Sequence, residues 1–246
     1  MTLGLGPRYS RCSEARKVGN MRSIAAVVIF SGGQDSTTVL FDAIERHGRD
    51  NVVALTFDYG QRHRSEVAAS REIAGLAGVE HVVVELKALG DLAISAQTSN
   101  AIEVAPTGGL HDLPTTFTPS RNLVFATLAS SYAISRGCST LYLGVCQTDF
   151  SGYPDCRKET IDALERVIKL GNGLDSFDIE TPLMWLTKWE TVCLAQRLGP
   201  VCMSALALTV TCYHGLRPGC GECPACQIRA RGFAEARVDD PAAVSP

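Results

Sequence analysis

The chain alternates between short apolar runs and longer stretches with helical spacing. Residues 24–30 are apolar at every position, and largely apolar runs recur at 52–57, 81–86 and 141–145. Runs of this kind are typical of parallel strands that are buried on both faces. Helical spacing predicts helices near 36–47, 65–76, 123–136, 158–170 and 188–198, and a further extended segment is expected at 177–181.

This alternation predicts an α/β fold with a doubly wound, mostly parallel sheet and right-handed crossovers. We expect a flexible tail at 1–20, a nucleotide-binding α/β domain at 21–205, a metal-binding annex at 206–236 and a second flexible tail at 237–246. Met21 stands just before the first apolar run, so the natural start is expected there. The stretch 88–119 has weak periodicity and predicts a loop region near the site.

Composition narrows the class of protein. The chain has 246 residues, of which 46% are hydrophobic, and 23 basic residues stand against 26 acidic ones, which gives a net charge of -3. Without an excess of basic charge, a nucleic-acid partner is not expected. No apolar run approaches the roughly 20 residues of a membrane-spanning helix, and the first 20 residues lack the apolar centre of a signal peptide. We therefore expect a cytoplasmic protein without a membrane partner.

The loop after the first apolar run carries the sequence Ser-Gly-Gly-Gln-Asp-Ser-Thr at 31–37. Two glycines permit a sharp turn and a close approach to a ligand, and the following helix directs unpaired N–H groups at the same place. The pattern therefore predicts an anion cradle. It lacks the Gly-Lys-Ser/Thr of nucleoside triphosphatases and the third glycine of the dinucleotide fingerprint. The alternative is a glycine turn, capped by Ser36, that binds nothing.

Four of the ten cysteines form a cluster with the spacing Cys212-x7-Cys220-x2-Cys223-x2-Cys226. Four thiolates within fifteen residues, with glycines at the turns, predict a tetrahedral structural zinc site, and an iron–sulfur cluster is the main alternative. Such crowding is also typical of a reducing compartment rather than a disulfide framework. The isolated cysteines are interpreted as small core residues.

Four more segments extend the pattern beyond the loop: DYGQRH at 58–63, TPSRN at 118–122, GVCQTDFSGYPDCR at 144–157 and PLMWLTK at 182–188. Together with SGGQDS, they resemble the 7-cyano-7-deazaguanine synthase family of pyrophosphate-loop enzymes over roughly 22–233. The resemblance implies an adenine-nucleotide alpha-hydrolase-like fold, one structural zinc per chain and a homodimer.

The resemblance also implies the chemistry. Such a loop holds the outer phosphates of ATP, so an acid is adenylated and pyrophosphate is released. The family implies a ligase that converts 7-carboxy-7-deazaguanine and ammonia to the nitrile 7-cyano-7-deazaguanine, through adenylated acid and amide intermediates in queuosine biosynthesis. No glutaminase domain is visible, which favours free ammonia. The ATP-binding residues would be Phe30, Ser31, Gly32, Gly33, Gln34, Asp35, Ser36 and Thr37.

Side-chain chemistry assigns candidate roles within these segments. Asp35 would help to hold Mg²⁺, Lys188 would neutralise charge on the phosphoryl oxygens, and Arg121 or Arg157 would meet a carboxylate or phosphate. Asp149 or Asp155 would accept hydrogen bonds from the N–H groups at the edge of the guanine-like ring, and Phe150 and Tyr153 would stack on that ring. The candidate substrate-binding residues are Tyr59, Gln61, Arg62, Asp149, Phe150, Tyr153, Asp155 and Arg157.

Three features depart from the family pattern. Residues 201–208 are apolar where a basic strand is expected, Ser120 replaces a smaller residue, and the first gap of the cysteine cluster is one residue short. Two other functions remain open. A tRNA thiolase or lysidine-forming ligase would share the loop but should carry basic surface, and a non-catalytic nucleotide-binding module would not release pyrophosphate.

Overall fold

The computed structural model describes residues 22–62, 64–148 and 152–243. The predicted tail at 1–20 therefore lies outside the described residues. The strands are β1 Ala26–Ile29, β2 Val52–Asp58, β3 Glu80–Glu85, β4 Thr140–Tyr142 and β5 Asp178–Glu180. The helices are α1 Gln34–His47, α2 Ser65–Ala77, α3 Lys87–Leu92, α4 Arg121–Ser135, α5 Lys158–Asn172, α6 Lys188–Arg197, α7 Pro200–Ala207 and α8 Pro224–Ala236, and the 3-10 turns are η1 Arg49–Asn51, η2 Leu110–Asp112 and η3 Pro154–Cys156.

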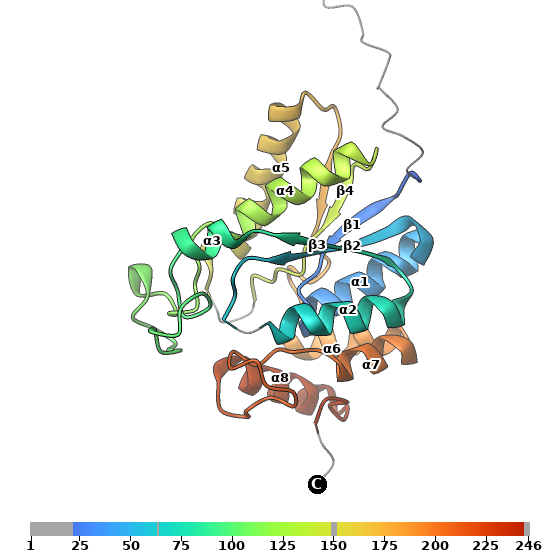
Figure 1. Cartoon of the computed structure of the whole chain (residues 1–246). Coiled ribbons are helices and arrows are strands. Elements are labelled where there is room, and N and C mark those ends of the chain that lie inside the picture. Colours follow the sequence, from blue (N-terminus) through green and yellow to red (C-terminus); the bar gives the residue numbers. More distant parts are fainter. Residues whose placement is uncertain (1–21, 63, 149–151, 244–246) are drawn as a thin grey trace, which may run out of the picture.

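The five strands form one sheet in the order β3-β2-β1-β4-β5, and every pair is parallel. Helices α4 and α5 cover one face, while α1, α2, α6 and α7 lie on the other (Figure 1). The order reverses at β1, which is the switch point where open parallel sheets place their ligands. The predicted doubly wound α/β class is confirmed.

The apolar run of β1 divides its side chains between two cores. Ala26, Val28 and Phe30 pack with α1 and the helices beside it, whereas Val27 belongs to the core under α4 and α5. Successive side chains of a strand point to opposite faces, so a run that is apolar throughout can supply both cores. Packing on both faces holds the central strand in place, so the loop that follows it lies at the carboxyl edge of the sheet.

Residues 201–208 do not form the strand that the family pattern led us to expect. They belong to α7, which begins at Pro200 and packs against α1 and α2. Cys202, Ala205 and Leu206 are fully buried in the core. Proline suits the first position of a helix, and the alanines favour helix over strand. The expectation of a strand was therefore wrong, and the apolar character of the segment reflects its place in the core.

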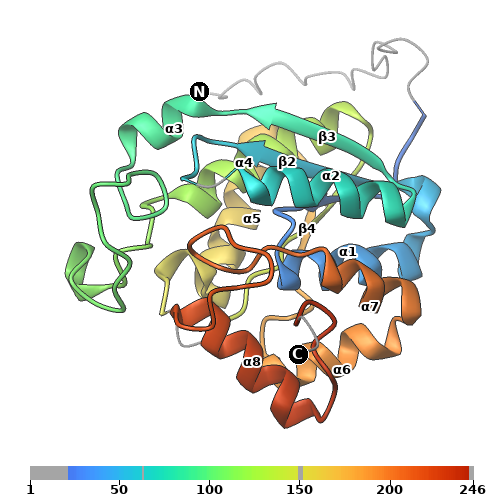
Figure 2. The same cartoon turned by 60° about the horizontal axis from the view of Figure 1, so that its bottom comes forward.

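Helix α8 packs against α6, and the side of the molecule that carries α8 and the cysteine-containing segment is at the bottom in Figure 1 and comes forward in Figure 2. The buried Arg229 on α8 forms two hydrogen bonds with Asp240, both of 2.7 Å, and donates to the Leu206 carbonyl at the end of α7. Within the stretch predicted as a tail, 237–246, Val238 packs on the core, and 244–246 lie outside the described residues.

Over the part of the chain that the structure describes, no helix has both the length and the apolar character needed to cross a membrane.

Candidate active site

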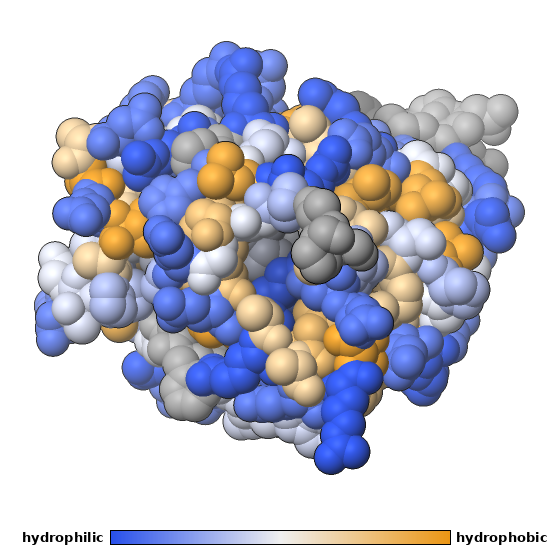
Figure 3. Space-filling model, turned by 90° about the horizontal axis from the view of Figure 1, so that it is seen from below, coloured by the Kyte–Doolittle hydropathy of each residue, from blue (hydrophilic) through white to orange (hydrophobic). Residues whose placement is uncertain are grey.

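A cavity of about 310 Å³ opens at the carboxyl edge of the sheet, and it is lined by the loop after β1, the starts of α4 and α6, and the cysteine-containing annex. Seen from below, the surface is hollowed near its centre, and hydrophobic residues are dispersed among hydrophilic ones (Figure 3). One wall is aromatic, because Phe57 and Phe125 stack with their ring centroids 4.4 Å apart. A flat ring system therefore has an apolar surface to lie against.

The loop 31–37 has the geometry of an anion cradle. Gly33 precedes α1 with extended backbone, and no side chain caps the helix. The hydroxyls of Ser31 and Ser36 lie 3.0 Å apart, and Thr37 donates to the Gly33 carbonyl over 2.8 Å. Gly32 has φ +85°, and a Cβ there would stand 2.7 Å from the Glu66 carbonyl oxygen. The loop is thus shaped by its own hydroxyls, and the N–H groups of the first helical turn are directed at the cavity.

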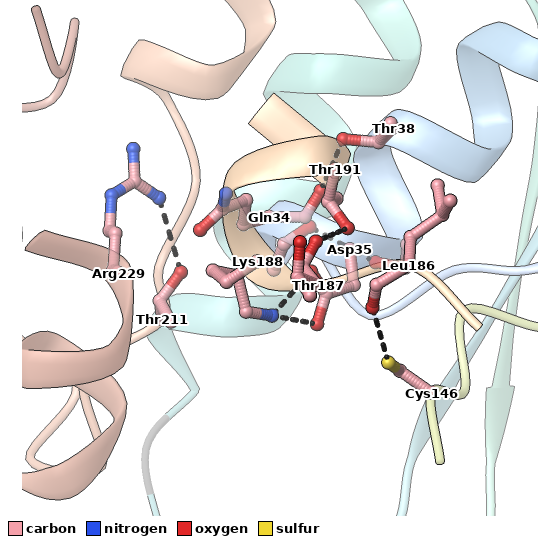
Figure 4. A network of polar contacts seen from close by, with 12 residues as sticks. Gln34, Asp35, Thr38, Cys146, Leu186, Thr187, Lys188, Thr191, Thr211 and Arg229 are labelled. Atoms are coloured by element: carbon pink, nitrogen blue, oxygen red, sulfur yellow. Dashed lines mark hydrogen bonds and ion pairs between the residues drawn. The ribbon is translucent and has the colours of Figure 1, made fainter. Parts of the chain in front are cut away.

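Lys188 and Asp35 meet inside the cavity although 153 residues separate them in sequence. The Lys188 ammonium contacts both Asp35 oxygens at 2.9 Å, and the two side chains are 13% and 29% exposed. Figure 4 shows Lys188 extending from the start of α6 towards Asp35 at the start of α1. Both side chains line the cavity, so a cation and a carboxylate stand together beside the loop 31–37.

The position of the Lys188 stem depends on Gly232 of α8. A Cβ at Gly232 would overlap with Cγ of Lys188 and would lie 3.1 Å from its Cβ. Helices α6 and α8 can pack closely at this point only because residue 232 has no side chain.

Arg121, at the start of α4, is the centre of a second polar group. Burial acts to lower its pKa, but the neighbouring Tyr59, Asp155 and Tyr153 raise it, so the guanidinium stays charged. Arg121 and Tyr59 are joined by a side-chain hydrogen bond. Burial raises the pKa of the Tyr59 and Tyr153 hydroxyls, which therefore stay protonated at neutral pH. This group can offer several donors to a substrate carboxylate or carbonyl oxygen.

Glu66, in the first turn of α2, is a carboxylate in the same cavity. Burial raises its pKa to about 7, and the charge of Arg121 acts in the opposite direction. Within the described part of the chain, its carboxylate forms no hydrogen bond and no ion pair. A half-ionised carboxylate at neutral pH is suited to proton transfer.

The four clustered cysteines converge in the annex, with all their sulfur atoms within 4.8 Å of one another. Tetrahedral zinc–thiolate bonds of about 2.3 Å require sulfur atoms about 3.8 Å apart, and Cys220 and Cys226 lie at 3.9 Å. A Cβ at Gly219 would stand 2.5 Å from the Cys226 sulfur. The backbone N–H of Cys223 donates to Cys220, and this bond is the main cause that lowers the Cys220 pKa to about 7. The donor set fits a tetrahedral metal centre.

The predicted site residues are only partly brought together. Tyr59, Gln61, Tyr153 and Arg121 line the cavity together with Asp35 and Lys188, and so do Phe30, Ser31, Gly33, Gln34 and Ser36. Gly32 and Thr37 are buried and stabilise the loop: Gly32 through its positive φ, and Thr37 through its hydrogen bond to the Gly33 carbonyl. Asp149 and Phe150 lie outside the described residues.

The remaining predicted substrate residues lie elsewhere. Asp155 is buried and does not line the cavity. It accepts a hydrogen bond from the Asn122 N–H, and its charge raises the pKa of Arg121. Arg157 is exposed beside Glu159, and Arg62 lines a small neighbouring hollow. Gln61 does line the cavity, and its side chain is hydrogen-bonded to the backbone at the end of β2.

The sequence interpretation missed Glu66, Gln97, Tyr213 and Arg229, which also line the cavity. Gln97 comes from the predicted loop region near the site, and Tyr213 and Arg229 come from the annex, which was interpreted as a purely structural unit. The one available signal for Glu66 was its place at the start of the helix that follows β2, near the ligand-binding edge of a parallel sheet.

Comparisons of the sequence with known proteins identify the family of this chain. Residues 25–237 match the family described as Queuosine biosynthesis protein QueC. The chain is 51% identical over 220 residues to the 7-cyano-7-deazaguanine synthase of Chromobacterium violaceum, covering 88% of this chain and 92% of that protein. The synthase of Laribacter hongkongensis is 48% identical, with 88% and 93% covered. A predicted subunit of tRNA methyltransferase from Methanocaldococcus jannaschii has a TM-score of 0.47 at 21% identity, covering 70% of this chain and 74% of that chain.

Proposed function

The chain belongs to the QueC family of queuosine biosynthesis proteins, and from this premise we propose that it is a 7-cyano-7-deazaguanine synthase. The reaction converts 7-carboxy-7-deazaguanine, ammonia and ATP to the nitrile, AMP and pyrophosphate. The observation that carries the proposal is the match over nearly the whole chain to relatives of this name, on a fold whose anion cradle opens into a cavity of about 310 Å³ with an aromatic wall.

The residues of the cavity support the chemistry of this reaction. We propose that the N–H groups after Gly33 hold the outer phosphates of ATP and that the substrate carboxylate attacks the α-phosphorus. The Lys188 ammonium then stabilises the charge that develops on the phosphoryl oxygens. An adenylate makes the acid oxygen a good leaving group, so ammonia can displace AMP to give the amide. Arg121 with its tyrosine partners would orient the substrate by donating to its oxygens.

We propose that Asp35 helps to hold Mg²⁺ against the phosphates, since carboxylate and phosphate oxygens are the ligands that this ion prefers. When bound, Mg²⁺ neutralises charge on the triphosphate. The four clustered cysteines would hold one structural zinc per chain. We also propose a homodimer and a cytoplasmic location; the second is supported by the clustering of four cysteines at a metal-ligand spacing, which is typical of a reducing compartment.

The products of the nucleotide test this function. Purified protein with Mg²⁺, ATP, ammonia and 7-carboxy-7-deazaguanine should release AMP and pyrophosphate and form the nitrile, measured by chromatography and mass spectrometry. Lys188→Ala should lower the rate about 100-fold, as is typical of a lost electrostatic contact to the transition state. ADP as the sole nucleotide product would exclude adenylation, and tRNA-dependent AMP release would favour a tRNA-modifying ligase instead.

A further inference from the structure

Glu66 is a titratable group of the cavity that the proposed adenylation does not use. The other carboxylates near the site are already engaged: Asp35 with Lys188, and Asp155 with the Asn122 backbone. Glu66 lines the cavity and forms no hydrogen bond or ion pair with any residue that the structure describes. Arg121 acts on it electrostatically without an ion pair within 4.0 Å. A carboxylate in such surroundings is available to a ligand.

The position of Glu66 is fixed next to the phosphate cradle. Its carbonyl oxygen would stand 2.7 Å from a Cβ at Gly32, so the first turn of α2 lies directly against the loop that holds the phosphates. The acid must be adenylated beside those phosphates, and the nitrogen must attack the same carbon. The Glu66 side chain therefore lines the cavity from a backbone segment that packs against the loop proposed to hold the outer phosphates of ATP.

The reaction itself requires a base. When ammonia displaces AMP from the adenylated acid, the C–N bond forms, the C–O bond breaks and nitrogen loses one proton. In the second round, the amide oxygen takes AMP from a second ATP. The C–O bond then breaks as the C–N bond becomes triple, and nitrogen loses its two remaining protons. Three N–H protons thus leave for each nitrile formed, and a group in the cavity must accept them.

We propose that the Glu66 carboxylate is the base that takes these protons from the ammonia and amide nitrogens. This inference rests on the proposed function, which supplies the nitrogen chemistry. Other charged or titratable groups near it are Arg121 of α4, Tyr59 after β2, Tyr213 of the annex and Arg62, which shares a small hollow with it. Arg121 stays charged and Tyr59 stays protonated near neutral pH, which leaves Glu66 as the acceptor. Between transfers, the carboxyl group returns its proton to water through the open cavity.

Glu66→Gln tests the proposal, because glutamine keeps the size of the side chain but cannot accept a proton. Adenylation is measured as acid-dependent exchange of ATP with pyrophosphate in the absence of ammonia, and it should stay within about threefold of the wild type. Conversion of the supplied amide to the nitrile should fall about 100-fold or more, as expected for loss of a general base. Glu85→Gln, at an exposed residue of β3, is the matched control and should leave both rates unchanged.

The pH profile gives a second readout. The amide reaction needs no ammonia, so its pH dependence is free of ammonia titration. Because the base must be ionised, the wild-type rate should fall as the pH drops below about 7, where Glu66 takes up a proton. Glu66→Asp should retain this limb and Glu66→Gln should lose it.

Three results would overturn the inference. The first is an unchanged amide rate in Glu66→Gln, and the second is a wild-type amide rate that stays flat through pH 7. The third is an equal loss of exchange and of nitrile formation in Glu66→Gln, which would make Glu66 a substrate-binding residue. Failure of the wild type to form any nitrile would instead refute the proposed function.

Discussion

At the scale of single residues, the absence of a side chain at Gly232 positions a charged group. A Cβ there would overlap with the Lys188 stem, whose ammonium binds Asp35 at 2.9 Å. Gly232→Ala should push Lys188 away from the phosphate cradle and lower kcat about tenfold, with a smaller change in KM for the acid. Overpacking of this kind also costs about 1–3 kcal/mol of stability. Steady-state kinetics together with thermal unfolding would measure both effects.

A control separates displacement of Lys188 from a general effect of alanine in a helix. Gly171 of α5 has nothing within 4 Å of its added Cβ. Gly171→Ala should therefore leave kcat unchanged and stabilise the protein by about 0.5–1 kcal/mol, because alanine loses less conformational freedom than glycine in a helix. If Gly232→Ala instead keeps full kcat, Lys188 does not need its observed position.

At the scale of elements, the annex links the four-cysteine cluster to the wall of the cavity. Cys223→Ser should abolish binding of about one zinc per chain and cost several kcal/mol, because apparent zinc binding energies reach roughly 10 kcal/mol or more. Tyr213 and Arg229 line the cavity from this annex, so binding of the acid should weaken as well. Elemental analysis, thermal unfolding and calorimetry would measure the three effects.

Cys193→Ser is the matched control, because Cys193 lies on α6 outside the cluster. It should retain the metal, the stability and the affinity for the acid. Iron with sulfide in the wild-type protein would contradict the zinc assignment, and unchanged affinity in metal-free protein would show that the annex wall holds its shape without metal.

The elements were predictable where one local pattern decides the structure. The apolar run of β1 and the glycine loop behind it define the strand, the turn and the start of α1 without reference to the rest of the chain. Helix α7 was missed because the family pattern outweighed a local signal, the proline at residue 200 followed by alanines.

The site was predictable only in part, because its members come from segments far apart in sequence. Asp35 and Lys188 each lie in a recognisable motif, so the sequence predicted both as site residues. Their contact, between residues 153 positions apart, could be known only from the fold. Asp155 was assigned to the substrate from its residue type, but its burial and its bond to the Asn122 N–H could not be foreseen. Glu66 lies in a helix with no motif, and only its burial in the cavity distinguishes it.

At the scale of the whole molecule, the sheet brings the loop 31–37, Lys188, Arg121 and two of the predicted tyrosines to a single edge, whereas Asp155 and Arg157 do not line the cavity there. Over the described residues, the loop after β1 is the one segment with the SGGxDS pattern, and it opens into the same cavity as Arg121 and Glu66. Conversion of an acid to a nitrile removes two oxygen atoms, and each must be activated before it can leave. One cradle must therefore serve both rounds, with the amide taking the place of the acid.

This arrangement predicts that the amide is itself a substrate. Supplied without ammonia, it should form the nitrile and consume one ATP per product, whereas the acid should consume two. Asp35→Ala and Lys188→Ala should slow both reactions by similar factors, about 100-fold, because the same two side chains act at the same phosphates in each round. Product analysis with quantified AMP would measure the stoichiometry. If the amide stays untouched while the acid still yields nitrile, the intermediate is never the free amide, and the two rounds must be joined in another way.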